Sequence, residues 1–258
     1  LFYLAKAFEW QSKKLSLNLS ADYLDNKAEP RNLLETYQRI TLSARLNKQW
    51  NTETMRYNAS LNVDYGGSFD NDKVDPEFNH GGIDKYKSTY NRYATSFVFA
   101  INSKNNQTFF TNGELSASFS YERNRLERTK LVQLDGDTPA ATTDAVLISP
   151  YKYTATHTVD GKPISVYLKA NANFTLPIKG LSNTMLVGTD YQMDRNLGEG
   201  QMFDRLHPVY TGASYRPRRY ADIPASQTLA AYIEETLSKG IGNHKLDIEM
   251  GVRAETML

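Results

Sequence analysis

The residues best suited to bind a ligand gather in one polar stretch late in the chain. Tyrosine and arginine combine a large contact surface with hydrogen-bonding groups, and a guanidinium binds a carboxylate or phosphate through two parallel hydrogen bonds. These residue types stand close together between residues 210 and 220, where the run Arg216-Pro217-Arg218-Arg219-Tyr220 occurs. We therefore predict that a ligand contacts Tyr210, Tyr215, Arg216 and Arg218.

The sequence predicts neither a metal site nor an enzyme. Its four histidines, His80, His157, His207 and His244, lie in separate connections without ligand spacing, and it has no cysteine. The acidic residues 70–77 depart from a calcium loop because Val74 replaces an oxygen ligand and no glycine follows it, so a solvated loop is the simpler interpretation. No Ser–His–Asp arrangement can be assembled. We expect no catalysis, cofactor or bound metal.

Charged residues also recur within extended segments, at every second position. They alternate with apolar side chains, so they would share one face of a sheet and point away from the apolar face. If the apolar face meets lipid, this polar face lines a lumen. The predicted lumen-lining residues are Arg39, Arg45, Arg56, Asp64, Lys169, Asp190, Asp247, Glu249, Arg253 and Glu255.

The elements that carry these residues are predicted to be long β-strands. Residues 54–65 alternate most clearly, with Met55, Leu61 and Tyr65 on one face and Arg56 and Asp64 on the other. The same period of two recurs in ten segments, most of which span 10 to 13 residues: 2–10, 14–25, 37–48, 54–65, 91–103, 114–123, 164–178, 184–193, 228–237 and 245–255. Soluble strands average about 5–6 residues, whereas tilted membrane-crossing strands need about 9–11. Strand length therefore favours membrane crossing.

The connections alternate between short and long along the whole chain. Residues 11–13, 49–53, 104–107, 179–183 and 238–243 are short, whereas residues 26–36, 66–90, 124–163 and 194–227 are long. This order is typical of an up-and-down outer-membrane barrel, with tight turns on one side and extended loops on the other. The loops 66–90, 124–163 and 194–227 would contact substrate. The basic run from Arg123 to Lys130 would meet lipopolysaccharide phosphates or an anionic substrate, with a solvated charge run as the alternative.

Composition is compatible with this interpretation. The 258 residues carry a net charge of +1 and a mean hydropathy of −0.57, with no apolar run long enough for a membrane helix. The near-balance of charge argues against a nucleic-acid partner. Aromatic residues make up 12% and gather near strand ends, as in the two girdles of outer-membrane barrels. The predicted girdle residues are Trp10, Tyr23, Tyr37, Trp50, Tyr57, Tyr65, Tyr90, Tyr93, Phe110, Tyr121, Tyr191 and Tyr232.

Residues 228–255 resemble a hairpin of TonB-dependent outer-membrane receptors. One strand, Leu229-Ala230-Ala231-Tyr232-Ile233-Glu234-Glu235, has the family's aliphatic-x-x-Tyr-x-x-acidic pattern. The next ends in Gly251-Val252-Arg253-Ala254-Glu255, which keeps the glycine, arginine and acid of the family pattern but has alanine where an aromatic is usual. The resemblance implies a 22-stranded barrel closed by an N-terminal plug domain, and uptake of siderophores, haem, cobalamin, glycans or peptides driven through the TonB complex.

We therefore predict an all-β protein, an antiparallel up-and-down transmembrane β-barrel of which residues 1–258 are one partial domain of about ten consecutive strands. It would lie in the outer membrane of a Gram-negative bacterium, in contact with lipid and lipopolysaccharide, with its own plug domain and the TonB complex as further partners. A surface lipoprotein is an open candidate partner. The alternatives are a passive porin, a ten-stranded outer-membrane protease and a soluble β-sandwich binding or adhesin module.

Overall fold

The structure is a computed structural model that describes residues 1–27, 35–72, 85–105, 109–133, 138–139, 146–147, 152–178, 180–209, 218–242 and 244–258. Twelve strands form one sheet: β1 (Phe2–Trp10), β2 (Leu15–Lys27), β3 (Glu35–Asn51), β4 (Met55–Asp72), β5 (Lys85–Ser103), β6 (Phe110–Gln133), β9 (Lys152–Gly161), β10 (Pro163–Ile178), β11 (Leu181–Asn196), β12 (Gly200–Phe203), β13 (Ser226–Ile241) and β14 (His244–Met257). A separate pair joins β7 (Thr138–Pro139) to β8 (Val146–Leu147), and short 3-10 turns are η1 (Gln11–Lys13) and η2 (Tyr220–Asp222).

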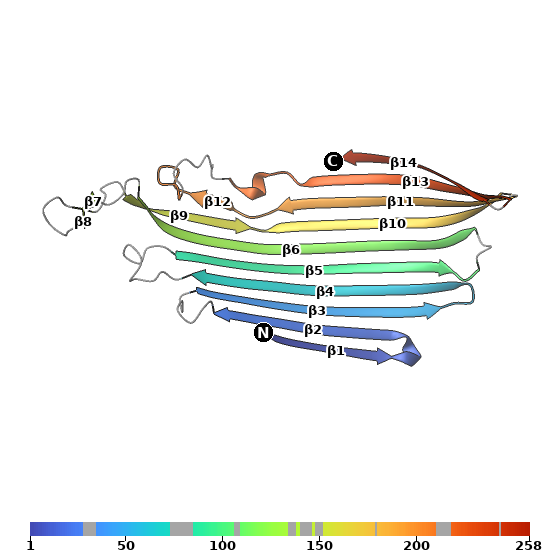
Figure 1. Ribbon diagram of the computed structural model, residues 1–258, viewed down its shortest axis with the longest axis horizontal. Helices are drawn as coiled ribbons and strands as arrows, with labels where there is room; N and C mark the ends of the chain where they lie inside the picture. The colour runs from blue at the N-terminus through green and yellow to red at the C-terminus, as the bar shows by residue number, and fades with distance from the viewer. Residues whose placement is uncertain are drawn as a thin grey trace.

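The main sheet is antiparallel and follows chain order, with the path β1-β2-β3-β4-β5-β6-β10-β11-β13-β14. These ten strands coincide with the ten predicted segments, so the all-β, up-and-down prediction is confirmed. The strand ends joined by the short connections lie together at one end of the sheet, and those joined by the long connections lie at the other (Figure 1). The sheet is not closed, because β1 and β14 are its two edges in the described part of the chain. No helix in that part is both long and apolar enough to span a bilayer.

One face of the sheet is apolar and exposed. Partners in antiparallel register point to the same side, so Leu61 shares its face with Leu46, Phe97 and Ala117. Large apolar side chains on this face remain more than a third exposed, including Leu61 at 38% and Val63 at 50%. Among described residues only four hydrophobic side chains are buried: Val132, Ala155, Val209 and Ala230. The accessible surface is 17875 Å², against about 11500 Å² for a globular protein of this mass. Apart from the small cluster of Val132, Ala155 and Val209, the described part of the sheet therefore lacks an apolar core.

The turns descend across the sheet in regular steps. Register partners on successive strands can be followed from β3 to β14, and together they form one row across the sheet. Where a turn joins two strands, half the number of residues that separate their two members of the row is the distance from the row to that turn. The partners are 7 residues apart across the β3–β4 turn (Trp50, Tyr57), 12 across β5–β6 (Ile101, Gly113), 15 across β10–β11 (Ala172, Val187) and 19 across β13–β14 (Ile233, Val252). The turn thus shifts by six residues over six strand spacings.

This stagger fixes the inclination of the strands. The turns shift along the strand direction by one residue, about 3.3 Å, for each step of about 4.8 Å between neighbouring strands. Each strand is therefore tilted by about 35° from the perpendicular to the line along which the turns lie. Figure 1 shows the same stagger, since the β13–β14 end projects well beyond the β1–β2 end. The tilt depends on pairing between distant segments, so it cannot be predicted from the periodicity of the sequence alone.

Tyrosines on the apolar face follow the same incline. Tyr65, Tyr93 and Tyr121 occupy one row, with ring centroids 5.1 and 6.4 Å apart. Tyr23 in β2 lies two rows further from the turns, and Tyr191 in β11 lies four rows nearer to them. The tyrosine line therefore falls six rows over six strand spacings, the same slope as the turns. A second group lies near the turns, where Trp50, Tyr57 and Phe99 contact one another and Phe109 and Phe110 contact Phe174.

Two predictions about these elements need correction. Of the predicted girdle residues, Tyr37, Tyr90 and Tyr232 lie on the polar face, because they fall out of phase with the apolar positions of their strands. The strands are also longer than predicted at the end opposite the turns, where β4 continues to Asp72 and β6 to Gln133. There the regular alternation of apolar and polar residues has ended, but the backbone pairing persists.

Candidate functional site on the polar face

Arg253 is the centre of a charged cluster on the polar face near the C-terminal edge. Its guanidinium donates two hydrogen bonds to Asp190, at 3.0 and 3.2 Å, and lies 3.2 Å from Glu255. Register places Asp190 in β11 opposite Ala230 in β13, which lies opposite Glu255 in β14. The arginine side chain therefore crosses β13 over the small Ala230, which is only 1% exposed. One cation with two carboxylates leaves this cluster with a net charge of −1.

An aromatic ring and a glycine complete the cluster. Tyr232 lies opposite both Gly188 and Arg253, and the guanidinium lies 5.9 Å from the centre of its ring. A Cβ at Gly188 would come within 2.2 Å of the Tyr232 ring, so the ring lies directly over the glycine. Glycine is needed at position 188 because any side chain would lift the tyrosine away from the sheet. Periodicity places Tyr232 on the polar face, whereas the role of Gly188 depends on its partner across the sheet.

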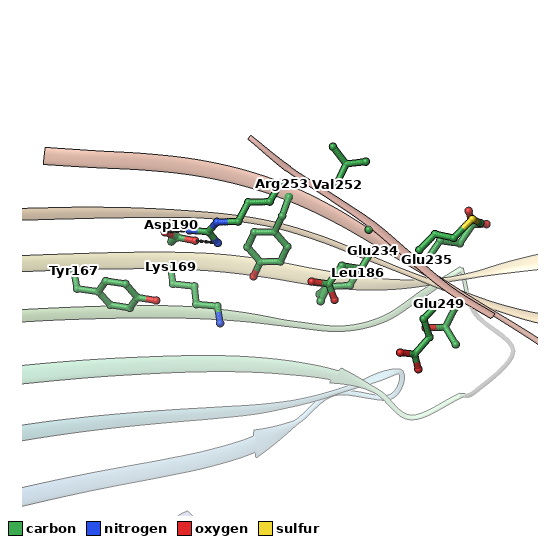
Figure 2. A pocket seen from close by; sticks show the side chains of 13 residues that line it. Tyr167, Lys169, Leu186, Asp190, Glu234, Glu235, Glu249, Val252 and Arg253 are labelled. Carbon is green, nitrogen blue, oxygen red and sulfur yellow. Dashed lines mark hydrogen bonds and ion pairs between the residues drawn. The ribbon is translucent and has the colours of Figure 1, made fainter. Parts of the chain in front are cut away.

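A concavity of about 790 Å³ opens beside this cluster. Tyr167 and Lys169 in β10, Glu234 in β13 and Glu249 in β14 line it together with Asp190, Tyr232 and Arg253. Figure 2 shows Arg253 directed toward Asp190, with Tyr167 and Lys169 further along the same wall. In the described part of the chain Lys169, Glu234 and Glu249 make no ion pair. The concavity thus offers aromatic surface, one cation and two carboxylates to a polar ligand or a protein segment.

All ten predicted lumen-lining residues lie on one face of the sheet by register. Several are held by neighbours on that face. Arg39 contacts Asp22 at 3.3 Å, Arg45 donates to Asn62 at 2.9 Å, and Asp64 accepts from Ser43 at 2.6 Å. Asp247 pairs with Lys245 at 2.9 Å. Five of the ten, Arg39, Asp190, Asp247, Arg253 and Glu255, are thus in ion pairs, and Arg45 and Asp64 are held by neutral partners.

At the end opposite the turns, β6, β9 and β12 extend beyond the tyrosine line. Tyr153 in β9 packs against a small cluster of Val132, Ala155 and Val209, and its hydroxyl donates to the carbonyl of Pro208 at 2.7 Å. His207 lies 5.0 Å from the Tyr153 ring centre and 2.6 Å from Asp204. The hydrogen bond from His207 lowers the pKa of Asp204 below its usual value of 3.8. This extension is a packed element, although the sequence predicted a loop over residues 124–163.

Titratable groups within the extension are shifted by their surroundings. Burial, and then the positive charge of Arg128, lowers the pKa of His157 below its usual 6.5. Burial alone would raise the pKa of Asp160, but the contact with Lys162 and the nearby Arg125 outweigh it and lower that pKa. Asn196 holds the junction of β9 and β10, because its side-chain oxygen accepts from the backbone of Lys162 at 2.8 Å and of Gly198 at 3.0 Å.

Three of the four predicted ligand contacts, Tyr210, Tyr215 and Arg216, lie outside the described residues. Arg218 is described: it is exposed, and its backbone exchanges two hydrogen bonds with the backbone of Gln201 in β12. The structure therefore brings Arg218 to the packed extension and away from the concavity around Arg253. No group of three or more acidic, histidine or cysteine side chains that could hold a metal occurs among the described residues.

No protein-family model, curated protein or solved structure matches the chain. The resemblance of residues 228–255 to TonB-dependent receptors consequently depends on those residues and on the strand pattern alone.

Proposed function

We propose that this chain forms part of the wall of an outer-membrane β-barrel, and that the barrel is a TonB-dependent receptor importing a scarce nutrient into a Gram-negative bacterium. The observation that carries the barrel is the common incline of the turns and of the tyrosines on the apolar face. A bilayer explains why the line of turns and the line of tyrosines have the same slope, because each would follow one surface of the membrane.

The dimensions support this proposal. Membrane barrels tilt their strands by about 35–45°, and the incline of this sheet corresponds to about 35°. Tyr57 and Tyr65 lie eight residues apart on β4, which is about 22 Å along the membrane normal at that tilt. The apolar band of such barrels is about 25 Å tall. The polar face opposite would then line the lumen.

The soluble β-sandwich alternative needs a second layer against the apolar face. No second sheet packs there in the described part of the chain, and leaving so many apolar side chains in water would promote association. A ten-stranded outer-membrane protease would close on itself, whereas β1 and β14 do not pair with each other. These observations favour a wall segment of a larger barrel.

Active import, in preference to a passive porin, is supported by the β13–β14 hairpin. Its resemblance to TonB-dependent receptors includes Tyr232, Arg253 and Glu255, the residues that meet around Asp190. We propose that the polar face contacts a plug domain of the same polypeptide, that the outer extensions contact the nutrient, and that TonB supplies the energy. A surface lipoprotein would bind at the outer extensions if the receptor uses one.

The test uses the complete polypeptide in its own bacterium. The barrel proposal expects the protein in the outer-membrane fraction with heat-modifiable gel migration, and a monomer stable in plain buffer would contradict it. The receptor proposal expects growth on the scarce nutrient to be lost equally when this gene or tonB is deleted. Growth that depends on this gene but not on tonB, together with open channels in lipid bilayers, would identify a porin.

A further inference from the structure

A group of basic side chains lies on the outward face, just beyond the tyrosine line. Arg123 is two residues past Tyr121 on β6, so both side chains point to the same side of the sheet. Arg195 in β11 lies in the same row as Tyr121 and is likewise on the apolar side. Both arginines are exposed. In the described part of the chain, neither makes an ion pair.

The incline places these two arginines at the same height. Arg123 lies two residues beyond Tyr121 on a strand tilted by about 35°, which places it about 5 Å above the tyrosine line. Arg195 lies in the row of Tyr121 but two strands further on, where the inclined tyrosine line is lower, so it is also about 5 Å above that line. Their Cα atoms are then about 12 Å apart across β10. Each guanidinium reaches several ångströms from its backbone, so both can contact one bulky anionic headgroup.

Two further cations lie close to the pair. Arg125 and Lys162 share the single carboxylate of Asp160, at 3.6 and 3.1 Å. These two cations with one anion, added to Arg123 and Arg195, give the group a net charge of +3. The adjoining hollow of about 480 Å³ is lined by charges of both signs, Lys87 and Arg125 with Glu127, Asp160 and Glu199. We call Arg123, Arg125, Lys162 and Arg195, together with Asp160, the outward basic group.

We propose that the outward basic group binds the phosphates of lipopolysaccharide in the outer leaflet around the protein. The proposal rests on the membrane-barrel proposal and decides between the two partners considered for the basic run. Arg123 and Arg125 face lipid, whereas Arg128, three residues further along the paired strand, lies on the opposite face with His157. An anionic substrate in the lumen cannot reach the outward pair. A phosphate at headgroup level can, and it accepts the forked hydrogen bonds of guanidinium groups.

The experiment is a lipid titration of the complete, detergent-purified protein, followed by native mass spectrometry. The probes are diphosphoryl lipid A and the same lipid with its phosphates removed. The test variant is R123Q/R195Q, and the matched control is R39Q/R45Q, which removes two arginines from the polar face. Heat-modifiable migration of both variants shows that each still forms a barrel.

We expect R123Q/R195Q to bind diphosphoryl lipid A about tenfold or more weakly than the unchanged protein, since charge-assisted hydrogen bonds are lost. The R39Q/R45Q control should bind it normally, and neither double variant should alter binding of the dephosphorylated lipid. Unchanged binding by R123Q/R195Q would overturn the proposal. Equal weakening by both double variants would also overturn it, because the effect would then be one of net charge. Absence of heat-modifiable migration in the unchanged protein would instead refute the barrel.

Discussion

Replacing Leu61 by arginine tests whether the apolar face meets lipid. Leu61 lies on β4 midway between Tyr57 and Tyr65, four residues from each, so the proposed tilt places it about 11 Å from either aromatic level. Its side chain is 38% exposed and points away from the polar face. If the aromatic levels mark the two membrane surfaces, position 61 is at the centre of the bilayer.

The magnitude follows from that depth. An arginine on the lipid face costs about 2–4 kcal/mol at the midplane and about 0–1 kcal/mol near the interface. We therefore expect Leu61→Arg to lower the free energy of unfolding by about 2–4 kcal/mol, Val63→Arg by less, and Tyr65→Arg least. On a water-exposed face, a surface substitution usually changes stability by about 0.5 kcal/mol or less.

The assay is equilibrium denaturant unfolding of the complete protein folded in lipid vesicles, followed by tryptophan fluorescence and gel migration. Ser60→Arg is the matched control, since Ser60 is adjacent on the same strand but points to the polar face. It should unfold within about 0.5 kcal/mol of the unchanged protein. Equal effects of Leu61→Arg and Ser60→Arg, or a cost that does not decrease from position 61 to 65, would refute the membrane assignment.

Three further outcomes are expected in the complete protein. Gly188→Ala should lower the free energy of unfolding by about 1–3 kcal/mol because its Cβ would displace the overlying tyrosine ring, whereas Gly240→Ala, with nothing within 4 Å, should change it little. A double-mutant cycle of Arg253→Met and Asp190→Asn should give a coupling energy of about 0.5–1 kcal/mol, since the pair has two hydrogen bonds but the arginine side chain is 49% exposed; a value indistinguishable from zero would contradict the pairing. Because burial lowers the pKa of His157 below 6.5, the unfolded extension binds more protons, so its stability should fall as the pH drops below 6.5 and should not change above it. Hydrogen exchange of β9 between pH 5 and 7.5 measures this, and the pH dependence should vanish in His157→Gln.

The strands and their faces could be predicted because apolar residues occupy one face of the sheet and polar residues the other, so each strand alternates regularly in sequence. Each strand carries its own period of two, as at Met55–Tyr65 within β4, and no second layer alters the pattern. The alternation of short and long connections likewise depends only on chain order. These local features gave all ten strands on the main path of the sheet.

Features that depend on pairing could not be predicted in the same way. The extension formed by β6 and β9 carries fewer apolar residues, and its cluster of Val132, Ala155, Val209 and Tyr153 joins positions from three separate segments, so it is visible only once the register is known. The closeness of Arg253 to Asp190, 63 positions earlier in the chain, requires the register of three strands. The incline of the turns also emerges only when all the registers are combined.

The polar face contains two kinds of charge, and this division limits what it can bind. Arg253 already contacts both Asp190 and Glu255, so a ligand would have to compete with two carboxylates for its guanidinium. Lys169, Glu234 and Glu249 line the adjoining concavity and make no ion pair within the described residues. A segment carrying opposite charges can therefore pair with these three without breaking contacts inside the sheet, and its gain is not offset by a lost ion pair. On this argument the Arg253 cluster holds β11, β13 and β14 together, while Lys169, Glu234 and Glu249 remain available to pair with a ligand of opposite charges on this face.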